Sequence, residues 1–468
     1  MTKPIVRLGV AGGLVVALAA AALGGAALPT TEPRPLPPVD PDGRTVTVCP
    51  AAPTINLVST TTWGALQTRS ITDEQGAPVP AGRGMTLTDA AQPVLMIAEG
   101  RQNQGAAAAA FSRHADGPDR GLSVVRCGTP ATSHWFTGLV SDPDGPAATR
   151  SEILLINADA GAAEVDLVLF GPSGPQVAPG ARGIPIPGRS VRTVALDTLF
   201  TRGEPVGVQV RTTRGRVAAL ARQRVSAGVQ PAGSDWQAGS TPPSIDQVVA
   251  GIPGGPGGRM LALTNPGKLR TTATIEALGP EGTFSPVDAS TVDVNAESTT
   301  FVRLEPALQG EPASLRIRAE QPLTASVVSR GGEGPLADLA VLPSSGALAG
   351  TSIGSVAVTG GVRGTLLISN PGEQEITVPA RLVGTDGAEL AATDVVVGPG
   401  ATADWVLDGI DRPAAVLVQA PAAGTAYAGL ALTSAADPAE GLATTSLSIP
   451  VLEQGGGIEP IFDPRAGR

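Results

Sequence analysis

Few residues of this 468-residue chain have the types and spacing that catalysis requires, and the sharpest match is a nucleophile-elbow pattern. Residues 350–354 read Gly-Thr-Ser-Ile-Gly, the G-x-S-x-G pattern that places a catalytic serine between a strand and a helix. A strand-like stretch follows the serine, and the two histidines, His114 and His134, lie far upstream. We therefore interpret this stretch as a glycine- and serine-rich linker between repeats, and we predict no catalytic residue.

Metal ligands are equally scarce. Asp-Pro-Asp-Gly occurs at residues 40–43 and 142–145, but Arg44 and Pro146 follow the glycines, where a calcium loop needs further oxygen ligands. Pro-Asp-Gly is also a turn sequence, so both copies are interpreted as turns, with calcium as the alternative. If the two cysteines form a structural disulfide, the two histidines that remain are too few ligands for a zinc site. We expect no metal and no cofactor.

His134 belongs to the densest aromatic cluster of the chain, His-Trp-Phe at residues 134–136. We interpret these side chains as partly buried strand residues. The alternative is a platform on which a sugar stacks against Trp135. Sugar-binding sandwiches usually display several aromatic side chains, whereas only 3% of this chain is aromatic.

The N-terminus carries an export signal or a membrane anchor. Lys3 and Arg7 precede Leu8–Leu28, which has no charged residue. As a helix, 21 residues extend about 31 Å, enough to cross a bilayer core. A cleaved signal peptide with a small-residue site at Gly25–Ala27 is the alternative to an anchor at residues 1–28. Either reading places the rest of the chain outside the cytoplasm, with residues 29–43 as a proline-rich stalk.

Export changes the interpretation of the two cysteines. Outside the cytoplasm, Cys49 and Cys127 are expected to form a disulfide, because no partner for a thiol nucleophile or metal pair is evident. Closing so long a loop contributes roughly 4.5 kcal/mol in the chain-entropy model.

Composition excludes one class of partner. The net charge is −10 and the 32 lysines and arginines form no cluster. Nucleic-acid binding depends on neutralising phosphates, so we expect no nucleic-acid partner. A hydrophobic fraction of 42% is sufficient for packed cores despite 60 glycines and 44 prolines.

Three asparagines mark an internal repeat. Asn157, Asn265 and Asn370 lie about 105 to 108 residues apart (265 − 157 and 370 − 265), each after an alternating apolar stretch. A second alternating stretch follows each asparagine and ends in a Gly-x-x-Gly turn, at Gly171, Gly279 and Gly384. We interpret the asparagine as a corner of the fold, not as a binding residue, because its side chain favours turns.

Period-two alternation, turn signals and units of about 105 residues predict an all-β chain of tandem immunoglobulin-like β-sandwiches. The expected repeats span residues 134–240, 241–345 and 346–454. Residues 44–133 form a divergent β region with the disulfide, either a fourth sandwich or a cap. Residues 455–468 are expected to be a disordered tail. If the protein has a binding surface, the divergent region is where we expect it.

The motifs together resemble a known family. Cys127, Pro130, Trp135, Phe136 and Gly138 precede units with Leu-x-x-Asn or Leu-x-Asn-Pro-Gly and Gly-x-x-Gly. This pattern resembles an uncharacterised family of secreted or membrane-tethered envelope proteins of high-GC Gram-positive bacteria, known only as a domain of unknown function. The resemblance covers most of residues 44–454, implies an envelope location, and supplies no catalytic residues.

The expected function is therefore non-catalytic. We expect an extracytoplasmic structural or protein-interaction protein of the cell envelope, with an envelope protein or glycan as partner and the membrane as a further contact through the N-terminal helix. The alternative is an array of carbohydrate-binding modules acting on surface polysaccharide or cell wall. An enzyme would require a pocket with convergent carboxylates.

Overall fold

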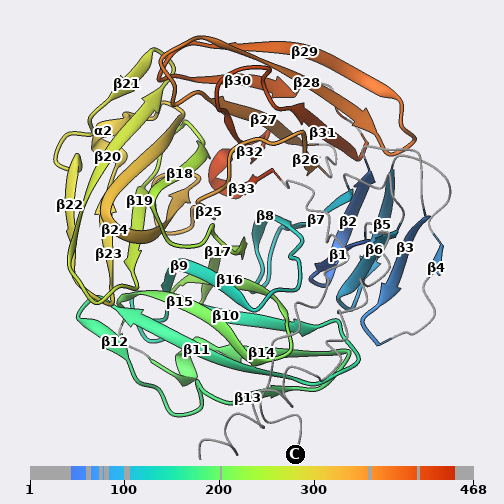
Figure 1. Ribbon diagram of the computed structural model, residues 1–468, viewed down its shortest axis with the longest axis vertical. Helices are drawn as coiled ribbons and strands as arrows, with labels where there is room; N and C mark the ends of the chain where they lie inside the picture. The colour runs from blue at the N-terminus through green and yellow to red at the C-terminus, as the bar shows by residue number, and fades with distance from the viewer. Residues whose placement is uncertain are drawn as a thin grey trace, which may run out of the picture. The chain divides into compact units, whose positions relative to one another are not determined.

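The structure is a computed structural model that describes residues 44–59, 65–72, 77–78, 84–99, 106–200, 203–356, 361–407, 410 and 412–447. These residues lie in one compact unit, Asp42–Gln454, and are almost entirely β (Figure 1). The predicted all-β class is confirmed. The apolar segment Leu8–Leu28, the stalk, the first Asp-Pro-Asp-Gly copy and the tail lie outside the described residues. No helix among the described residues is long and apolar enough to cross a membrane.

The strands form four successive groups, each with two sheets, which we call the first to fourth sheet pairs. The first contains β1 (Arg44–Cys49), β2 (Ala52–Ser59), β3 (Ala65–Ser70), β4 (Ala77–Pro78), β5 (Gly84–Ala90), β6 (Val94–Glu99), β7 (Ala106–His114) and β8 (Gly121–Arg126). The second contains β9 (Ser133–Val140), β10 (Ala147–Asn157), β11 (Ala163–Gly171), β12 (Gly174–Gln176), β13 (Ile184–Ile186), β14 (Ser190–Ala195), η1 (Leu196–Thr198), β15 (Pro205–Arg214), β16 (Ala218–Ala227) and β17 (Gln230–Ala238).

The last two groups are built from similar elements. The third contains β18 (Ser244–Ile252), β19 (Arg259–Asn265), β20 (Thr271–Gly279), β21 (Gly282–Phe284), β22 (Thr291–Val294), β23 (Ser298–Arg303), α2 (Glu305–Leu308), β24 (Ala313–Arg330) and β25 (Leu339–Pro343). The fourth contains β26 (Thr351–Val356), β27 (Val362–Ser369), β28 (Ile376–Gly384), β29 (Glu389–Val397), β30 (Thr402–Leu407), β31 (Ala414–Gln419), β32 (Tyr427–Ser434), η2 (Pro438–Glu440) and β33 (Leu442–Ser446).

All four sheet pairs share one strand order. The first has sheets β1-β6-β3-β4 and β5-β2-β7-β8, and the fourth has β26-β31-β28-β29 and β30-β27-β32-β33. The second repeats this order, with β13 also paired to β11. In the third, the long strand β24 pairs with β18 and β20 through its first half and with β19 and β25 through its second, which joins both sheets. The divergent region 44–133 therefore has the same topology as the repeats.

Alternation along the strands explains their place in the fold. In β11, Val165, Leu167 and Leu169 are buried between more exposed residues, and the apolar face of β20 and β28 is buried in the same way. The residues two and four positions before each repeat asparagine are also fully buried. One face of each strand thus fills the space between two sheets, as the period-two pattern predicts.

The last strands of the four sheet pairs meet one another. β8 contacts β17, β17 contacts β25, β25 contacts β33, and β33 contacts β8. In Figure 1 these four strands lie at the middle of the unit, with the other strands around them. Apolar side chains of the first sheet pair, Leu122 and Val124 among them, also pack in the core of the fourth. The first and last sheet pairs are therefore neighbours, and the four close into a ring.

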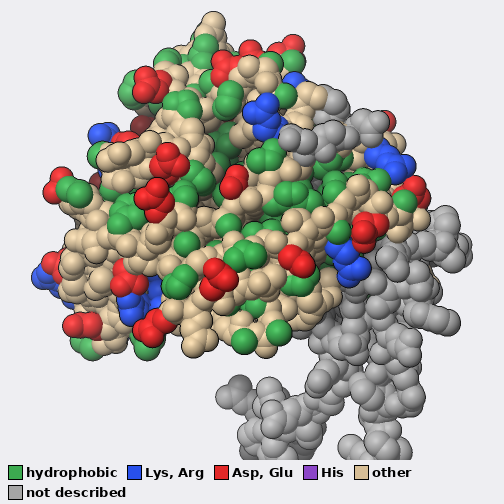
Figure 2. Space-filling view, turned by 90° about the horizontal axis from the view of Figure 1, so that it is seen from above, with side chains coloured by type: hydrophobic (Ala, Val, Ile, Leu, Met, Phe, Trp, Pro, Cys, Tyr) green, Lys and Arg blue, Asp and Glu red, His purple; other side chains and the backbone are tan. Residues whose placement is uncertain are grey.

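The surface has no dominant patch of positive charge on the face shown in Figure 2, where lysine and arginine side chains are scattered among carboxylates. Several basic side chains are paired with acidic ones, as for Arg211 with Asp166 and Lys268 with Glu297. This arrangement agrees with the negative net charge of the whole chain.

Candidate interaction site

The repeat asparagines are corners of the fold, as predicted, and they make the same hydrogen bonds in three sheet pairs. The side-chain amide of Asn265 donates to the carbonyls of Leu269, at 2.8 Å, and of Val294 and Asn295, and its Oδ1 accepts from the Gly267 amide at 2.9 Å. Asn157 and Asn370 repeat this pattern, and all three asparagines are buried. None has positive φ. The side chain, and not a left-handed backbone, makes the corner.

The second glycine of each Gly-x-x-Gly turn is required by its backbone. Gly174, Gly282 and Gly387 have φ of 123°, 133° and 81°, which disfavour any other residue. A Cβ at Gly174 or Gly282 would meet no atom within 4 Å, so backbone conformation and not space selects glycine there.

The nucleophile-elbow pattern lies in a strand. Gly350 has φ of 55° and turns the chain into β26, and Ser352 lies within that strand, fully buried. The expectation of a linker is wrong, because residues 351–356 pair with β31 as an edge strand of the fourth sheet pair. A serine on a strand and under the surface cannot serve as the exposed nucleophile that an elbow presents.

The second Asp-Pro-Asp-Gly copy forms the expected turn. The Gly145 amide donates to the Asp142 carbonyl, and Asp142 pairs with Thr149 to close the loop between β9 and β10. In the described part of the chain, no group of three or more acidic, cysteine or histidine side chains is placed to hold a metal ion.

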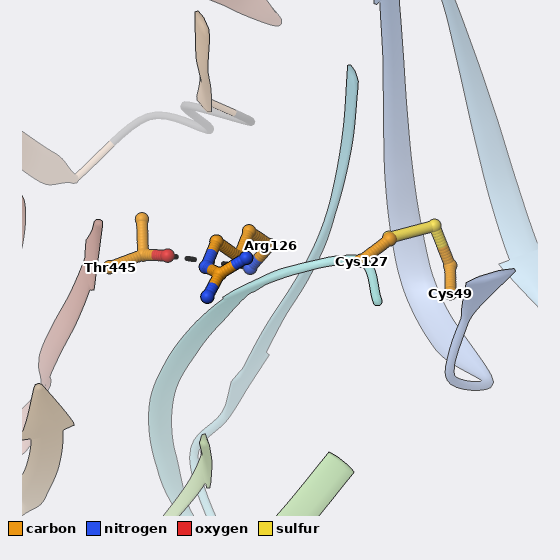
Figure 3. Close-up of a disulfide and its surroundings, with 4 residues drawn as sticks. All are labelled: Cys49, Arg126, Cys127 and Thr445. Atoms are coloured by element: carbon orange, nitrogen blue, oxygen red, sulfur yellow. Dashed lines mark hydrogen bonds between the residues drawn. A yellow bond between two sulfur atoms is a disulfide. The ribbon is translucent and has the colours of Figure 1, made fainter. Parts of the chain in front are cut away.

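Cys49 and Cys127 form the predicted disulfide, which joins β1 to the end of β8 (Figure 3). The preceding residue, Arg126, points the opposite way. Its amide donates to Thr445 Oγ1, its Nε donates to Ser446 Oγ at 3.0 Å, and its Nη2 donates to the Gly239 carbonyl at 2.7 Å. Cys127 therefore links the end of β8 to β1 of its own sheet pair, and the adjacent Arg126 links it to the second and fourth sheet pairs.

A single buried carboxylate collects backbone amides from three sheet pairs. Asp338 Oδ2 accepts from the amides of Leu122, at 2.8 Å, and Leu442, at 2.9 Å, and its Oδ1 accepts from Leu339. These amides belong to the first or second residue of β8, β33 and β25, so Asp338 lies where three inner strands begin. We call this group the Asp338 cluster.

Glycines make room for that carboxylate. A Cβ built on Gly121 or Gly233 would come within 2.4 Å of Asp338 Oδ1, which is inside any permitted contact. Gly121 starts β8 and Gly233 lies in β17. At these two glycines the first and second sheet pairs thus present backbone alone to the carboxylate, which comes from the third.

Asp235 repeats the arrangement one step further along the inner strands. Its Oδ1 accepts from Ser123 Oγ at 2.7 Å and its Oδ2 accepts from the Val341 amide at 2.8 Å. Burial raises the pKa of Asp338 to about 7 and raises the pKa of Asp235 well above its ordinary value. The amide donors, and Arg120 near Asp338, oppose these increases in part.

Trp135 cannot act as the sugar platform of the alternative reading. It is 8% exposed and stacks on Phe170, with ring centroids 6.0 Å apart. Its neighbour His134 bonds the Val217 carbonyl through Nε2 at 2.7 Å, and burial lowers the pKa of that imidazole. Both side chains support the packing of β9, as the simpler interpretation predicts.

A different tryptophan lies in a groove. Trp236, half-buried on β17, lines a cavity of about 390 Å³ between the first and second sheet pairs, which we call the Trp236 groove. The other walls come from residues 51–53 and 89–91, from Ser112 and His114 on β7, and from Asp119 and Arg222. Most of these belong to the divergent region 44–133.

Two charged side chains of the groove, Asp119 and Arg222, are paired. The Arg222 guanidinium lies 4.9 Å from the Trp236 ring centre, and Asp119 bonds both Arg222 and Arg224. Glu152 approaches the same two arginines. Burial, followed by the neighbouring Arg224, lowers the pKa of Arg222 to about 9. An aromatic ring beside fixed carboxylate, guanidinium and hydroxyl groups is a combination that can stack on and hydrogen-bond a sugar.

A larger cleft, about 830 Å³, lies in the third sheet pair. Its walls are glycine-rich backbone at residues 255–258 and 332–334 together with α2. Arg259 forms the floor, buried, and donates to the carbonyls of Pro253, Gly254, Gly257, Gly258 and Arg330. Its guanidinium is fully engaged by backbone and is therefore a structural centre of this loop.

Sequence reasoning missed Asp338, Asp235, Arg259 and Trp236. A signal existed for Asp338, which stands alone in the apolar stretch Leu336–Leu342, where a lone charge indicates a buried polar contact. Asp235 and Trp236 stand in a short polar stretch that carries no periodic signal. Their roles depend on contacts between sheet pairs, which are remote in sequence.

Comparisons with known proteins identify a family and little more. A model described as "Family of unknown function (DUF5719)" matches residues 84–408. No curated protein matches. Among solved structures, particles derived from infectious bursal virus match at 12% identity and TM-score 0.12, over 65% of this chain and 74% of theirs. An alpha-L-rhamnosidase of Streptomyces avermitilis matches at 12% identity and TM-score 0.12, over 80% of this chain and 54% of its own. Likenesses this weak carry no argument.

Proposed function

We propose that this chain, which belongs to the DUF5719 family of unknown function, is a rigid extracytoplasmic scaffold that binds a protein partner in the bacterial cell envelope. The proposed role is non-catalytic. The envelope location rests on the charged and apolar N-terminal sequence, and the disulfide is compatible with it, since disulfides persist outside the cytoplasm.

The observation that carries the proposal is the shared buried polar network of the inner strands. Asp338 accepts amides from three sheet pairs, and Asp235 and Arg126 add bonds among all four. A satisfied buried network fixes one arrangement of the elements that contribute to it. Four sandwich-like elements held in one arrangement provide a wide, stiff surface, which favours binding large partners over enclosing a small substrate.

We also infer that each sheet pair is immunoglobulin-like at its centre. In the fourth sheet pair the second strand pairs with the fifth and the third with the sixth, as β27–β30 and β28–β31. The equivalent pairings in the second sheet pair are β10–β14 and β11–β15, because its edge position holds two short strands. These are the B–E and C–F pairings of an immunoglobulin sandwich. The first and last strands differ, because β9 pairs with β15 and β17 pairs with β16.

Crosslinking in intact cells tests the scaffold proposal. The full chain, with its N-terminal segment retained, is crosslinked in place, purified and analysed for covalently captured proteins. Recovery of one defined envelope protein supports the proposal. Recovery of only abundant, unspecific proteins, at levels equal to those captured by an unrelated exported protein, contradicts it.

A second candidate function, carbohydrate binding, is favoured by the Trp236 groove. The half-buried ring lines the same groove as Asp119, His114 and Ser112, which offer donors and acceptors there. The site differs from the Trp135 platform considered from sequence, because Trp135 is buried.

Binding to cell-wall and capsule fragments distinguishes the two functions. Wild-type chain and Trp236→Ala are compared by calorimetry, with Phe284→Ala as the matched control. Phe284 is an exposed aromatic residue at 38% on another sheet pair, outside the groove. Carbohydrate binding predicts affinity in the wild type and the control and at least a tenfold loss in Trp236→Ala. Unchanged affinity in Trp236→Ala excludes the groove as the site.

A further inference from the structure

β29 is an exposed edge strand with an unusual length for its position. It ends the sheet β26-β31-β28-β29, and within the described residues it pairs only with β28. Figure 1 places it on the outer side of the fourth sheet pair, and the view from that side in Figure 2 shows many hydrophobic side chains among scattered charges. An edge strand leaves a row of amides and carbonyls without ladder partners.

The same position is interrupted in the other repeats. In the second sheet pair it holds two three-residue strands, β12 and β13, and in the third it holds β21 and β22. Proline lies between the short strands in both cases, with glycine as well in the second sheet pair, which is a usual way to prevent edge-to-edge pairing. β29 instead runs nine residues, Glu-Leu-Ala-Ala-Thr-Asp-Val-Val-Val, without proline, glycine or a basic residue.

We propose that β29 is the surface through which two copies of this chain join their sheets, antiparallel and edge to edge, about a twofold axis at Thr393. A twofold contact requires a strand that is complementary to itself. The register centred on Thr393 meets this requirement. Its residue pairs are Thr393 with Thr393, Ala392 with Asp394, Ala391 with Val395, and Leu390 with Val396.

The chemistry of these pairs supports a second copy as the occupant. The only charge inside the register, Asp394, faces an alanine, so no like charges oppose each other. Ala392, Asp394 and Val396 share the exposed face of the strand, with Val396 53% exposed, whereas Val395 and Val397 face the sandwich interior and are buried. A β-bulge offsets Leu390 from β28, while Ala391–Val397 remains regular. In the pair, Val395 of each copy therefore lies opposite Ala391 of the other on the face towards the sandwich interior, and Val396 of each copy is covered by Leu390 of the other.

Charge substitutions at Ala392 test this register, measured as the dissociation constant of the purified full chain by sedimentation. Ala392 is exposed, so either substitution leaves the monomer intact. Ala392→Asp sets two like-charge pairs against Asp394 of the second copy, and it should weaken association about tenfold. Ala392→Lys sets two opposite-charge pairs, and it should retain or strengthen association. Val229→Asp and Val229→Lys, at a 98% exposed site elsewhere, should change nothing.

A cysteine pair tests the same register without relying on affinity. Directly opposed residues lie within disulfide distance, whereas residues displaced by two along the partner strand do not. Mixed Ala392→Cys and Asp394→Cys chains should therefore crosslink under mild oxidation, and neither variant should crosslink alone. Four results would overturn the proposal. They are equal weakening of association by Ala392→Asp and Ala392→Lys, a wild-type chain that stays monomeric at about 100 µM, no crosslink in the mixture of the two cysteine variants, and capture of a segment of a different protein on β29.

Discussion

At the scale of single residues, buried polar side chains determine where the chain turns and where sheet pairs meet. Asn265 is the clearest case, because one side chain satisfies three carbonyls and one amide that the corner leaves without ladder partners. A buried carbonyl that loses its donor costs the desolvation of that group. The corner therefore depends on the amide nitrogen, which only asparagine offers at this length.

Asn265→Asp should lower the free energy of unfolding by about 2–4 kcal/mol, because a carboxylate would face three carbonyl oxygens in a buried site. Denaturant titration measures the effect. Asn295→Asp is the matched control, since the exposed Asn295 contributes its backbone carbonyl to the same corner and not its side chain. Equal loss in both variants would show that the loop tolerates no charge, and would remove the special role of Asn265.

The pKa of Asp338 predicts a pH dependence of stability. Burial raises the pKa to about 7 in the folded chain, from an ordinary value near 4 when unfolded. The folded state then binds the proton more tightly, so its contribution to stability is fully present below pH 4 and is lost as pH rises towards 7. Wild type should lose on the order of a few kcal/mol, relative to Asp338→Asn, between pH 5 and pH 8.

Comparing the two chains removes the titration of groups that both contain, except for the part of the raised pKa of Asp235 that comes from the charge of Asp338 and belongs to the same effect. The lowered pKa of His134 acts in the opposite direction, costing stability as pH falls below about 6.5, but His134 is present in both chains and cancels. Unfolding titrations at several pH values provide the measurement. A difference between the chains that is constant with pH would show that Asp338 remains ionised in the folded state.

Residue-scale prediction from sequence succeeded where the cause is local. An asparagine between two alternating stretches and a glycine at a tight turn act on neighbouring backbone, so their spacing in the sequence predicted the corner and the turn. Asp338 acts on amides more than 100 residues away in sequence on either side, from Leu122 to Leu442. Nothing in the local pattern around Leu336 or Leu342 specifies those partners.

At the scale of elements, the period-two signal identified strands well, because each has one face in a core. It failed at Thr351–Val356, which was expected to be a linker, because β26 is an edge strand whose sequence is rich in serine and glycine. It also could not establish that β1–β8 repeat the topology of the other groups. That similarity lies in strand pairing and not in the asparagine motif, which residues 44–133 lack.

The loop before β19 depends on one cation. Arg259→Met should destabilise the unit by about 3–5 kcal/mol, because five buried or half-buried carbonyls lose their common donor. Arg259→Lys should fall between methionine and wild type, since an ammonium group reaches fewer of them. Arg303→Met is the control, as the Arg303 side chain is 78% exposed and lies 3.9 Å from Glu305. Denaturant unfolding provides the measurement, and equal effects of the two methionine variants would contradict this role.

At the scale of the whole unit, closure of the ring couples the first sheet pair to the fourth. β8 of the first sheet pair contacts β33 of the fourth, and Arg126 bonds Ser446 there while the next residue carries the disulfide to β1. A change at the disulfide should therefore reach the fourth sheet pair through one residue. If the four sheet pairs folded independently, the loss of stability would remain in residues 44–126.

Replacing both cysteines, Cys49→Ser with Cys127→Ser, should lower the free energy of unfolding by about 2–5 kcal/mol, because the unfolded chain regains the freedom of a long loop. Hydrogen exchange in the native state locates the loss. We expect amides of β33, such as Leu442, to lose protection together with those of β1, and unfolding to remain a single transition, since the inner strands share one polar network. Arg126→Met, with the disulfide intact, should loosen β33 more than β1. Protection lost in β1 to β8 alone, with β33 unchanged in both variants, would mean that the ring is closed by contact only and that the sheet pairs unfold separately.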